Sequence, residues 1–141
     1  MFKKVLLAVD LNYEASWRKA LPVALAWCRL EGASLHVLNV APEVTAQLSA
    51  FFPSDANRKI LDETLARLRK FVADHVPGDI PVQDIIAQGP VHREILEVSE
   101  QIGADLIVMG APAPGVRDIL LGANAAHVVR HSRRSVLVVR E

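Results

Sequence analysis

The residues best suited to chemistry lie in the last quarter of the chain, between Asp105 and Arg140. A buried-strand pattern is followed by a loop after Gly110, by a helical pattern opened by Gly122 and Asn124, and by a second apolar run. Backbone N–H groups at a helix N-terminus carry partial positive charge and lack intrahelical acceptors, so a loop delivered there by a strand can hold an anion. The pattern therefore predicts a phosphate-binding site.

The same stretch lacks some of the donors that a phosphate requires. Pro112 and Pro114 have no N–H, and no Ser or Thr stands beside Gly122. Ala123 occupies the neighbouring position, and Asn124 after it offers an amide donor instead. Two alternatives stay open from these residues, a working anion site and an empty one.

Strands and helices alternate along the chain. Short apolar runs rich in β-branched residues predict strands at 4–9, 34–40, 81–87, 106–109 and 135–139. Amphipathic runs predict helices at about 13–30, 56–75, 90–102 and 124–130. Four of the strands are apolar nearly throughout, which indicates a parallel sheet covered on both faces, whereas 81–87 is typical of an edge. Pro22 predicts a kink, or a helix proper that begins close to Leu21.

This order predicts a doubly wound α/β fold of the flavodoxin-like or Rossmann-like kind. It is a five-stranded parallel sheet in the order 3-2-1-4-5, with helices on both faces. Such sheets bind ligands at the carboxyl ends of strands, where the winding reverses. The first and fourth strands are neighbours there, so we expect Asp10 and Gly110 to line one crevice.

Length and charge narrow the functional classes. A chain of 141 residues suits one domain, 1–141. Lys plus Arg equals Asp plus Glu at 16 each, so no net charge attracts nucleic acid or an anionic membrane. The single cysteine, Cys28, excludes an internal disulfide and fits a reducing compartment. Because no signal core and no run of transmembrane length is found, we expect a cytoplasmic protein without nucleic-acid or membrane partners.

Patterns typical of enzymes are missing from the sequence. It contains no Gly-x-Ser-x-Gly elbow, no Gly-Lys-Ser/Thr loop, no cluster of His and Cys and no paired carboxylates at strand ends. A phosphoacceptor receiver domain needs clustered acids after the first strand and a lysine after the fifth, but Asp10 stands alone and the chain ends in Arg140 and Glu141. We therefore predict no catalytic residue and no metal ligand, and expect a binding module more than an enzyme.

Several segments resemble the universal stress protein family: KKVLLAVD, LHVLNVAPE, GPVHREILEVSEQIGADLIVMG and ILLGANAAHVVRHSRRSVLVV. The resemblance spans essentially the whole chain, and its most specific part runs from Gly89 to Gly110. It implies a stress-response role, five parallel strands and, commonly, a homodimer paired through the last strand, here Ser135 to Val139. That strand is apolar, and an unpaired sheet edge there would attract a two-fold partner.

The nucleotide-binding branch of this family implies ATP, with magnesium, held between the first and fourth strand ends and a Gly-x2-Gly-x9-Gly-Ser/Thr loop. Carried over to this chain, the resemblance implies that Ala8 and Asp10 lie near adenine and ribose and that Val40 touches the base. It implies that Met109 and Gly110 line the pocket. The phosphate-binding turn would comprise Gly122, Ala123 and Asn124.

The sequence departs from this loop pattern. Ala113 stands in place of the second glycine, Gly122 comes one residue early, and Ala123 replaces the hydroxyl donor. Losing a charge-assisted hydrogen bond costs about 1.5–3 kcal/mol, roughly one to two decades in affinity. Three functions stay open: a stress-response module with a degraded adenine-nucleotide site, a nucleotide-free dimeric interaction protein, and a slow ATP hydrolase or phosphotransferase.

Some of these residues also have a purely structural interpretation. Asp10 either hydrogen-bonds a ribose or holds the turn after the first strand. Met109 suits core packing at a strand end, and His92 either reaches a phosphate or is a solvated first-turn residue. Phe51 and Phe52, in a loop over the sheet end, are predicted as lid or interface residues.

Overall fold

The sheet has the predicted strand order. The computed structural model describes residues 1–43, 50–51, 54–111 and 118–141, without the side chains of 118–121. Five parallel strands lie in the order β3-β2-β1-β4-β5, which confirms the prediction and places β3 at an edge. Their bounds are Lys4–Ala8 (β1), Ser34–Ala41 (β2), Val82–Gln88 (β3), Leu106–Ala111 (β4) and Ser135–Arg140 (β5).

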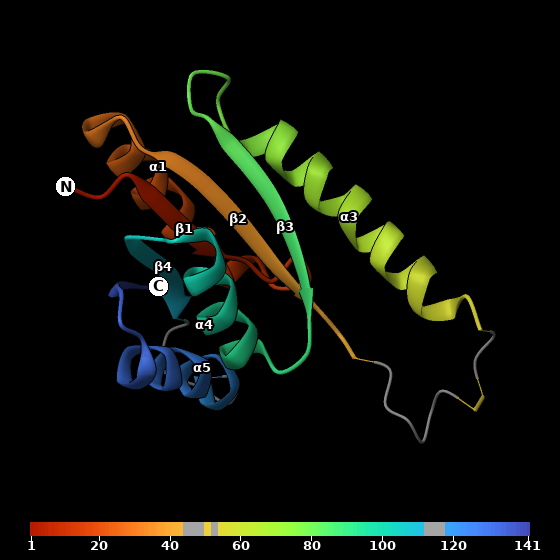
Figure 1. Ribbon diagram of the computed structural model, residues 1–141. Helices are drawn as coiled ribbons and strands as arrows, with labels where there is room; N and C mark the ends of the chain where they lie inside the picture. The colour runs from red at the N-terminus through yellow and green to blue at the C-terminus, as the bar shows by residue number, and fades with distance from the viewer. Residues whose placement is uncertain (44–49, 52–53, 112–117) are drawn as a thin grey trace.

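Helices cover both faces of this sheet (Figure 1). They are η1 (Glu14–Ser16), α1 (Ala20–Glu31), α3 (Ala56–His75), α4 (Val91–Ile102) and α5 (Asp118–His131). The first core, under α1 and α3, is built on Leu7, Val37 and Leu68. The second core, under α4 and α5, is built on Leu6 and Ile107. Side chains alternate between the two cores along each central strand, which explains why these strands are apolar throughout.

The proline in the first helical run sets the start of α1. The helix begins at Ala20, so Pro22 lies in its first turn, where the missing N–H has no intrahelical acceptor in any case. Residues upstream form η1 and a turn, and the predicted start at residue 13 is therefore wrong, whereas the start near Leu21 is confirmed. Gly32 and Gly103 end α1 and α4 in the left-handed region, with φ of 63° and 67°.

The last helix begins earlier than its sequence pattern indicates. It starts at Asp118, so Gly122, Ala123 and Asn124 lie in its second turn and do not open it. The predicted start at residue 124 is wrong because one glycine costs only about 1 kcal/mol in a helix and does not break it. The expectations placed on Phe52, Pro112, Ala113 and Pro114 concern positions outside the described residues. Phe51 is described and is 84% exposed.

His36 is a buried titratable group in β2, beside Leu6 of β1. It is 8% exposed, its Nε2 lies 3.3 Å from the hydroxyl of Ser34, and its Nδ1 has no partner among the described residues. Burial, together with the charge of Lys4, lowers the pKa of the imidazole, and a hydrogen bond with Gln83 opposes them. The folded protein therefore favours the neutral ring.

Stability is expected to fall in mild acid because of this histidine. The unfolded chain binds the proton at a pKa of about 6.5, above the folded value, so the contribution is complete above that pH and is lost as the pH falls toward the folded pKa. The slope is at most about 1.4 kcal/mol per pH unit. Urea unfolding measured at about pH 7.5 and at about pH 5.5 gives the free energy of unfolding at each pH. This free energy should fall less between the two pH values in His36→Leu than in the native chain. Equal losses would contradict the assignment.

Candidate functional site

Two distant segments converge at the carboxyl edge of the sheet, defined here as the carboxyl ends of β1, β2 and β4. Ala8 pairs with Met109 in the β1–β4 register and with Leu38 in the β1–β2 register. Asp10 lies two residues after the end of β1, and Gly110 follows Met109 within β4. The predicted convergence of Asp10 and Gly110 on one edge is therefore confirmed, and this edge is where the winding of the sheet reverses.

Asp10 holds the turn that follows β1. Its Oδ1 accepts the N–H of Asn12 at 2.9 Å, and its carbonyl accepts the N–H of Tyr13 at 3.0 Å. The Ser16 hydroxyl accepts the N–H of Asp10 at 2.8 Å and donates to its carbonyl at 3.2 Å. The structural interpretation of Asp10 is thus observed. Its side chain is exposed at this edge, and the ribose role stays a prediction.

The backbone at the end of this turn packs directly against Gly110. A β-carbon at Gly110 would overlap the carbonyl oxygen of Ser16 and lie 2.8 Å from its carbonyl carbon. The backbone of η1 therefore reaches β4 only because residue 110 lacks a side chain. Sequence reasoning identified Gly110 but not Ser16, since the contact joins residues that are far apart along the chain.

Three of the other predicted pocket residues, Ala8, Val40 and Met109, pack against the second core. Met109 is 4% exposed and belongs to that core, and Ala8 and Val40 are partly buried against it. On α5, which covers the same core, Gly122 and Asn124 are half-buried and Ala123 is exposed. Ala8, Val40 and Met109 therefore contact one core, with Met109 in the packing position that its residue type indicates, whereas Gly122, Ala123 and Asn124 are not part of that core.

Arg67 is a polar residue of this edge that the sequence did not single out. Its Nη2 donates to Asn12 Oδ1 at 2.9 Å and to the carbonyl of Leu11 at 3.4 Å, so α3 is tied to the loop that Asp10 begins. An arginine on an amphipathic helix is expected to face solvent, so its position in the sequence does not indicate this contact. An arginine beside the loop supplies positive charge and planar donors at the site.

An ion pair at the same edge joins Arg18, which follows η1, to Glu141, which follows β5. Arg18 Nη2 lies 2.8 Å from Glu141 Oε2, and the N–H of Glu141 donates to the carbonyl of Ala111 at 3.1 Å. The hydrogen bond and charge of Arg18 lower the pKa of the Glu141 carboxyl. Because Arg18 is more than half exposed, the pair contributes little to stability, and its role is to position the strand end.

The comparisons with known proteins agree with this geometry. The sequence profile of the universal stress protein family matches residues 1–140. This chain belongs to that family. Universal stress protein G of Shigella flexneri is 30% identical over 143 residues, covering 99% of this chain and all of the relative.

Solved structures share the fold of this universal stress protein. The structure of MJ0577, from Methanocaldococcus jannaschii, aligns with a TM-score of 0.72 and 25% identity, covering 100% of this chain and 97% of the other. A family member from Arabidopsis thaliana, solved with AMP bound, aligns with a TM-score of 0.70 and 19% identity, covering 99% and 92% of the two chains. At that identity the second comparison supports the fold alone.

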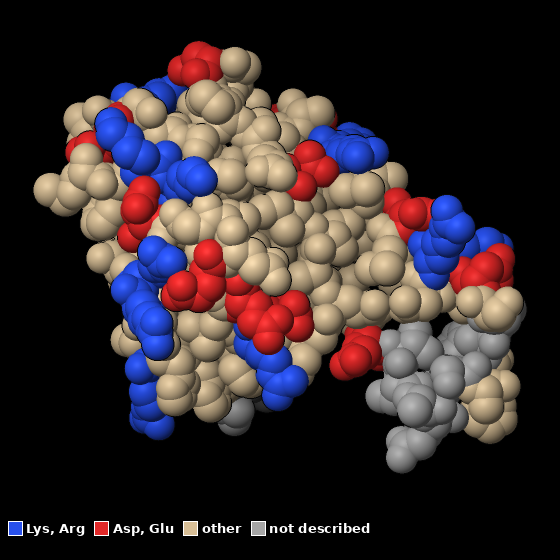
Figure 2. Space-filling model, viewed as in Figure 1, with Lys and Arg blue, Asp and Glu red and all other residues tan. Residues whose placement is uncertain are grey.

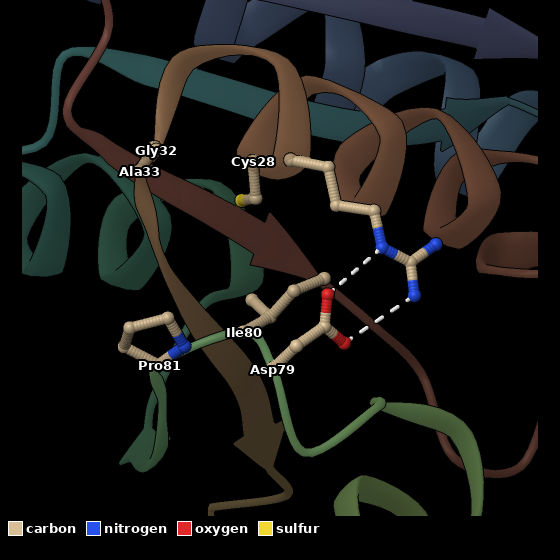
Figure 3. A pocket seen from close by; sticks show the side chains of 7 residues that line it. Cys28, Gly32, Ala33, Asp79, Ile80 and Pro81 are labelled. Atoms are coloured by element: carbon tan, nitrogen blue, oxygen red, sulfur yellow. Dashed lines mark hydrogen bonds and ion pairs between the residues drawn. The ribbon is translucent and has the colours of Figure 1, made fainter.

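A cavity of about 410 Å³ lies at the opposite, amino end of the sheet (Figure 3). It is lined by Cys28, Arg29, Gly32, Ala33, Asp79, Ile80 and Pro81, and the guanidinium of Arg29 lies 3.2 and 3.4 Å from the carboxylate oxygens of Asp79. Burial raises the pKa of the Cys28 thiol to about 11, so the unreactive thiol form prevails. Because doubly wound sheets bind ligands at the other end, this cavity does not define the site.

The surface of this family member carries charges of both signs, as its equal numbers of basic and acidic residues indicate. Basic and acidic side chains are interspersed over the face shown in Figure 2, with acidic groups over α4. Among the described residues, every helix is either too short or too polar to span a bilayer.

Proposed function

We propose that this universal stress protein is a homodimeric stress-response module that binds an adenine nucleotide at the carboxyl edge without rapid turnover. The observation that supports this most is the pairing of Ala8 with Met109, which sets Asp10 and Gly110 side by side at the switch point of the sheet. Family membership and the AMP bound to the Arabidopsis relative favour adenine as the base.

In this proposal the two sides of the nucleotide have different partners. Ala8 and Val40 contact the base, and Met109 and Gly110 form the wall behind it. Asp10 accepts a hydrogen bond from the ribose, since its exposed carboxylate keeps acceptor capacity beyond the bond from Asn12. The phosphates lie toward the second turn of α5, at Gly122, Ala123 and Asn124, and Arg67 adds positive charge at the same edge.

Calorimetric titration with AMP, and with ATP and magnesium, tests the proposal. We expect one nucleotide per chain and a weakening of about ten- to a hundredfold in Asp10→Asn, because the charged acceptor for the ribose is lost. Asparagine keeps the Oδ1 that holds the Asn12 turn, so the fold is retained. No heat, and no rise in melting temperature in millimolar nucleotide, would refute nucleotide binding.

The runner-up function is a nucleotide-free dimeric interaction protein. It is favoured by the burial of Met109 and by the contact between Gly110 and η1, both of which use predicted pocket residues for packing. An ATP hydrolase or phosphotransferase has less support, because the sequence contains none of the catalytic motifs of those enzymes. Phosphate release at an equal rate in Asp10→Asn would indicate contamination and not turnover.

Association through β5 gives a separate prediction. β5 is an outer strand of the sheet, and Leu137 on it is 37% exposed, whereas Val138 packs against the second core. Leu137→Lys should shift the protein from dimer to monomer in sedimentation velocity, because a charged side chain on the edge disfavours pairing with a second strand. Leu30→Lys, on the 75% exposed Leu30 of α1, is the control and should leave the dimer intact. If Leu137→Lys remained a dimer, β5 would not form the dimer interface.

A further inference from the structure

Helix α3 contacts the segment between β1 and α1 at two points. Arg67 Nη2 donates to Asn12 Oδ1 at 2.9 Å and to the carbonyl of Leu11 at 3.4 Å. About one helical turn further along α3, the ring of Phe71 meets that of Trp17 edge to face, with centroids 4.9 Å apart. Residues at i and i+4 lie on the same side of a helix, so one side of α3 holds this segment at both points.

The contact at Asn12 continues to the carboxylate of Asp10. The side chain of Asn12 accepts a hydrogen bond from Arg67, and its backbone N–H donates to Asp10 Oδ1 at 2.9 Å. The three residues therefore form a hydrogen-bonded chain, which we call the α3 relay. Leu68, next to Arg67, is completely buried in the first core. Core packing thus fixes the helix from which the α3 relay begins.

We propose that Arg67 is a positioning residue of the nucleotide site and acts on the ribose through Asn12 and Asp10. This inference rests on the proposed function, in which the Asp10 carboxylate accepts a hydrogen bond from the ribose. Oδ1 is engaged by the turn, and Oδ2 has no partner among the described residues, so Oδ2 is left for a hydroxyl. Asp10, Asn12 and Arg67 are all exposed. Without the α3 relay this loop would move more freely, and nucleotide binding would have to order it at a cost in affinity.

A positioning role differs from a simple effect of positive charge. The charge of an arginine at this edge favours the phosphates, over a range of about 10 Å at moderate salt. It does not favour adenosine, which carries no phosphate. The α3 relay acts instead on the ribose, which adenosine and AMP share. The two roles therefore predict different results for the same variant.

Calorimetric titration of the purified protein with AMP and with adenosine tests this proposal. We expect Arg67→Ala to weaken the binding of both ligands about three- to tenfold, since the loss of one hydrogen bond changes affinity by roughly that factor. Asn12→Ala removes the side-chain acceptor but keeps the backbone N–H, and it should weaken both ligands by a similar factor. The double variant should bind about as well as either single variant, because both changes break one chain of contacts.

Two controls separate positioning from a loss of structure. Arg69→Ala is the matched variant, because Arg69 is an exposed arginine of α3 that pairs with Asp84 at 3.5 Å, and it should bind both ligands like the native chain. Arg67→Ala should melt within about 2 °C of the native chain, since the residue is exposed. Added to Asp10→Asn, which already weakens the ribose contact, Arg67→Ala should reduce affinity by a smaller factor than it does in the native chain.

Three results would overturn the proposal while leaving nucleotide binding in place. Unchanged affinities in Arg67→Ala would show that the α3 relay does not serve the site. A loss confined to AMP would leave only an effect of charge on the phosphate. Additive losses in the double variant of Arg67 and Asn12 would show that the two residues act separately. If the native chain bound neither ligand, the proposed function and this inference would both be wrong.

Discussion

Replacing Gly110 with alanine is expected to lower the free energy of unfolding by about 3 kcal/mol, at the upper end of the usual range for overpacking. The new methyl group would overlap the carbonyl oxygen of Ser16 and stand 2.8 Å from the carbonyl carbon. Both are backbone atoms of η1, so no side chain can swing away. Either the turn lifts off β4 or the strand is displaced.

Thermal unfolding measures this effect against a matched glycine. A loss of about 3 kcal/mol lowers the melting temperature of a domain of this size by roughly 6–12 °C. Gly78→Ala is the control, because a β-carbon there meets nothing within 4 Å, and it should be neutral or slightly stabilising. If the two variants melted alike, η1 would not rest on Gly110 in solution.

Gly110→Ala is also expected to disturb the proposed nucleotide site. Ser16 both covers Gly110 and hydrogen-bonds the backbone of Asp10 on its N–H and carbonyl sides. Displacing η1 therefore moves the carboxylate that we assign to the ribose. Gly110 serves the proposed function by allowing Asp10 to be held in place, whether or not it touches the nucleotide itself.

The sheet was predictable because its signals are local. Continuous apolar runs indicate β1, β2, β4 and β5, the more polar run at 81–87 indicates an edge at β3, and Pro22 indicates where α1 begins. The convergence of Asp10 and Gly110 then followed from topology alone. These inferences need only the periodicity of side chains and the right-handed crossover.

The details of the site were not predictable in this way because they depend on contacts between distant segments. Ser16 against Gly110 and Arg67 against the loop at Asn12 join residues whose local patterns indicate only a turn and a solvated helix face. The sequence pattern places the start of α5 too late because it treats Gly122 as a residue that interrupts a helix. A single glycine is tolerated inside a helix, and α5 begins at Asp118.

Restoring the missing hydroxyl is expected to strengthen nucleotide binding. Ala123→Ser should raise the affinity for ATP with magnesium by about ten- to a hundredfold in calorimetric titration, since a hydrogen bond to a charged group contributes about 1.5–3 kcal/mol. Residue 123 is exposed on α5, so the new hydroxyl is free to turn toward a phosphate. This prediction depends on the proposed function.

Ala126→Ser separates a phosphate contact from a general effect of serine. Residue 126 is also an exposed alanine of α5, about one turn further from the helix start, so both variants have the same small cost in helix propensity. Only the serine at 123 should strengthen binding. If neither did while the native chain bound nucleotide, the phosphates would not reach the second turn of α5. The remaining donors on α5 would then be the backbone N–H groups of its first turn, which begins at Asp118 and where such groups lack intrahelical acceptors.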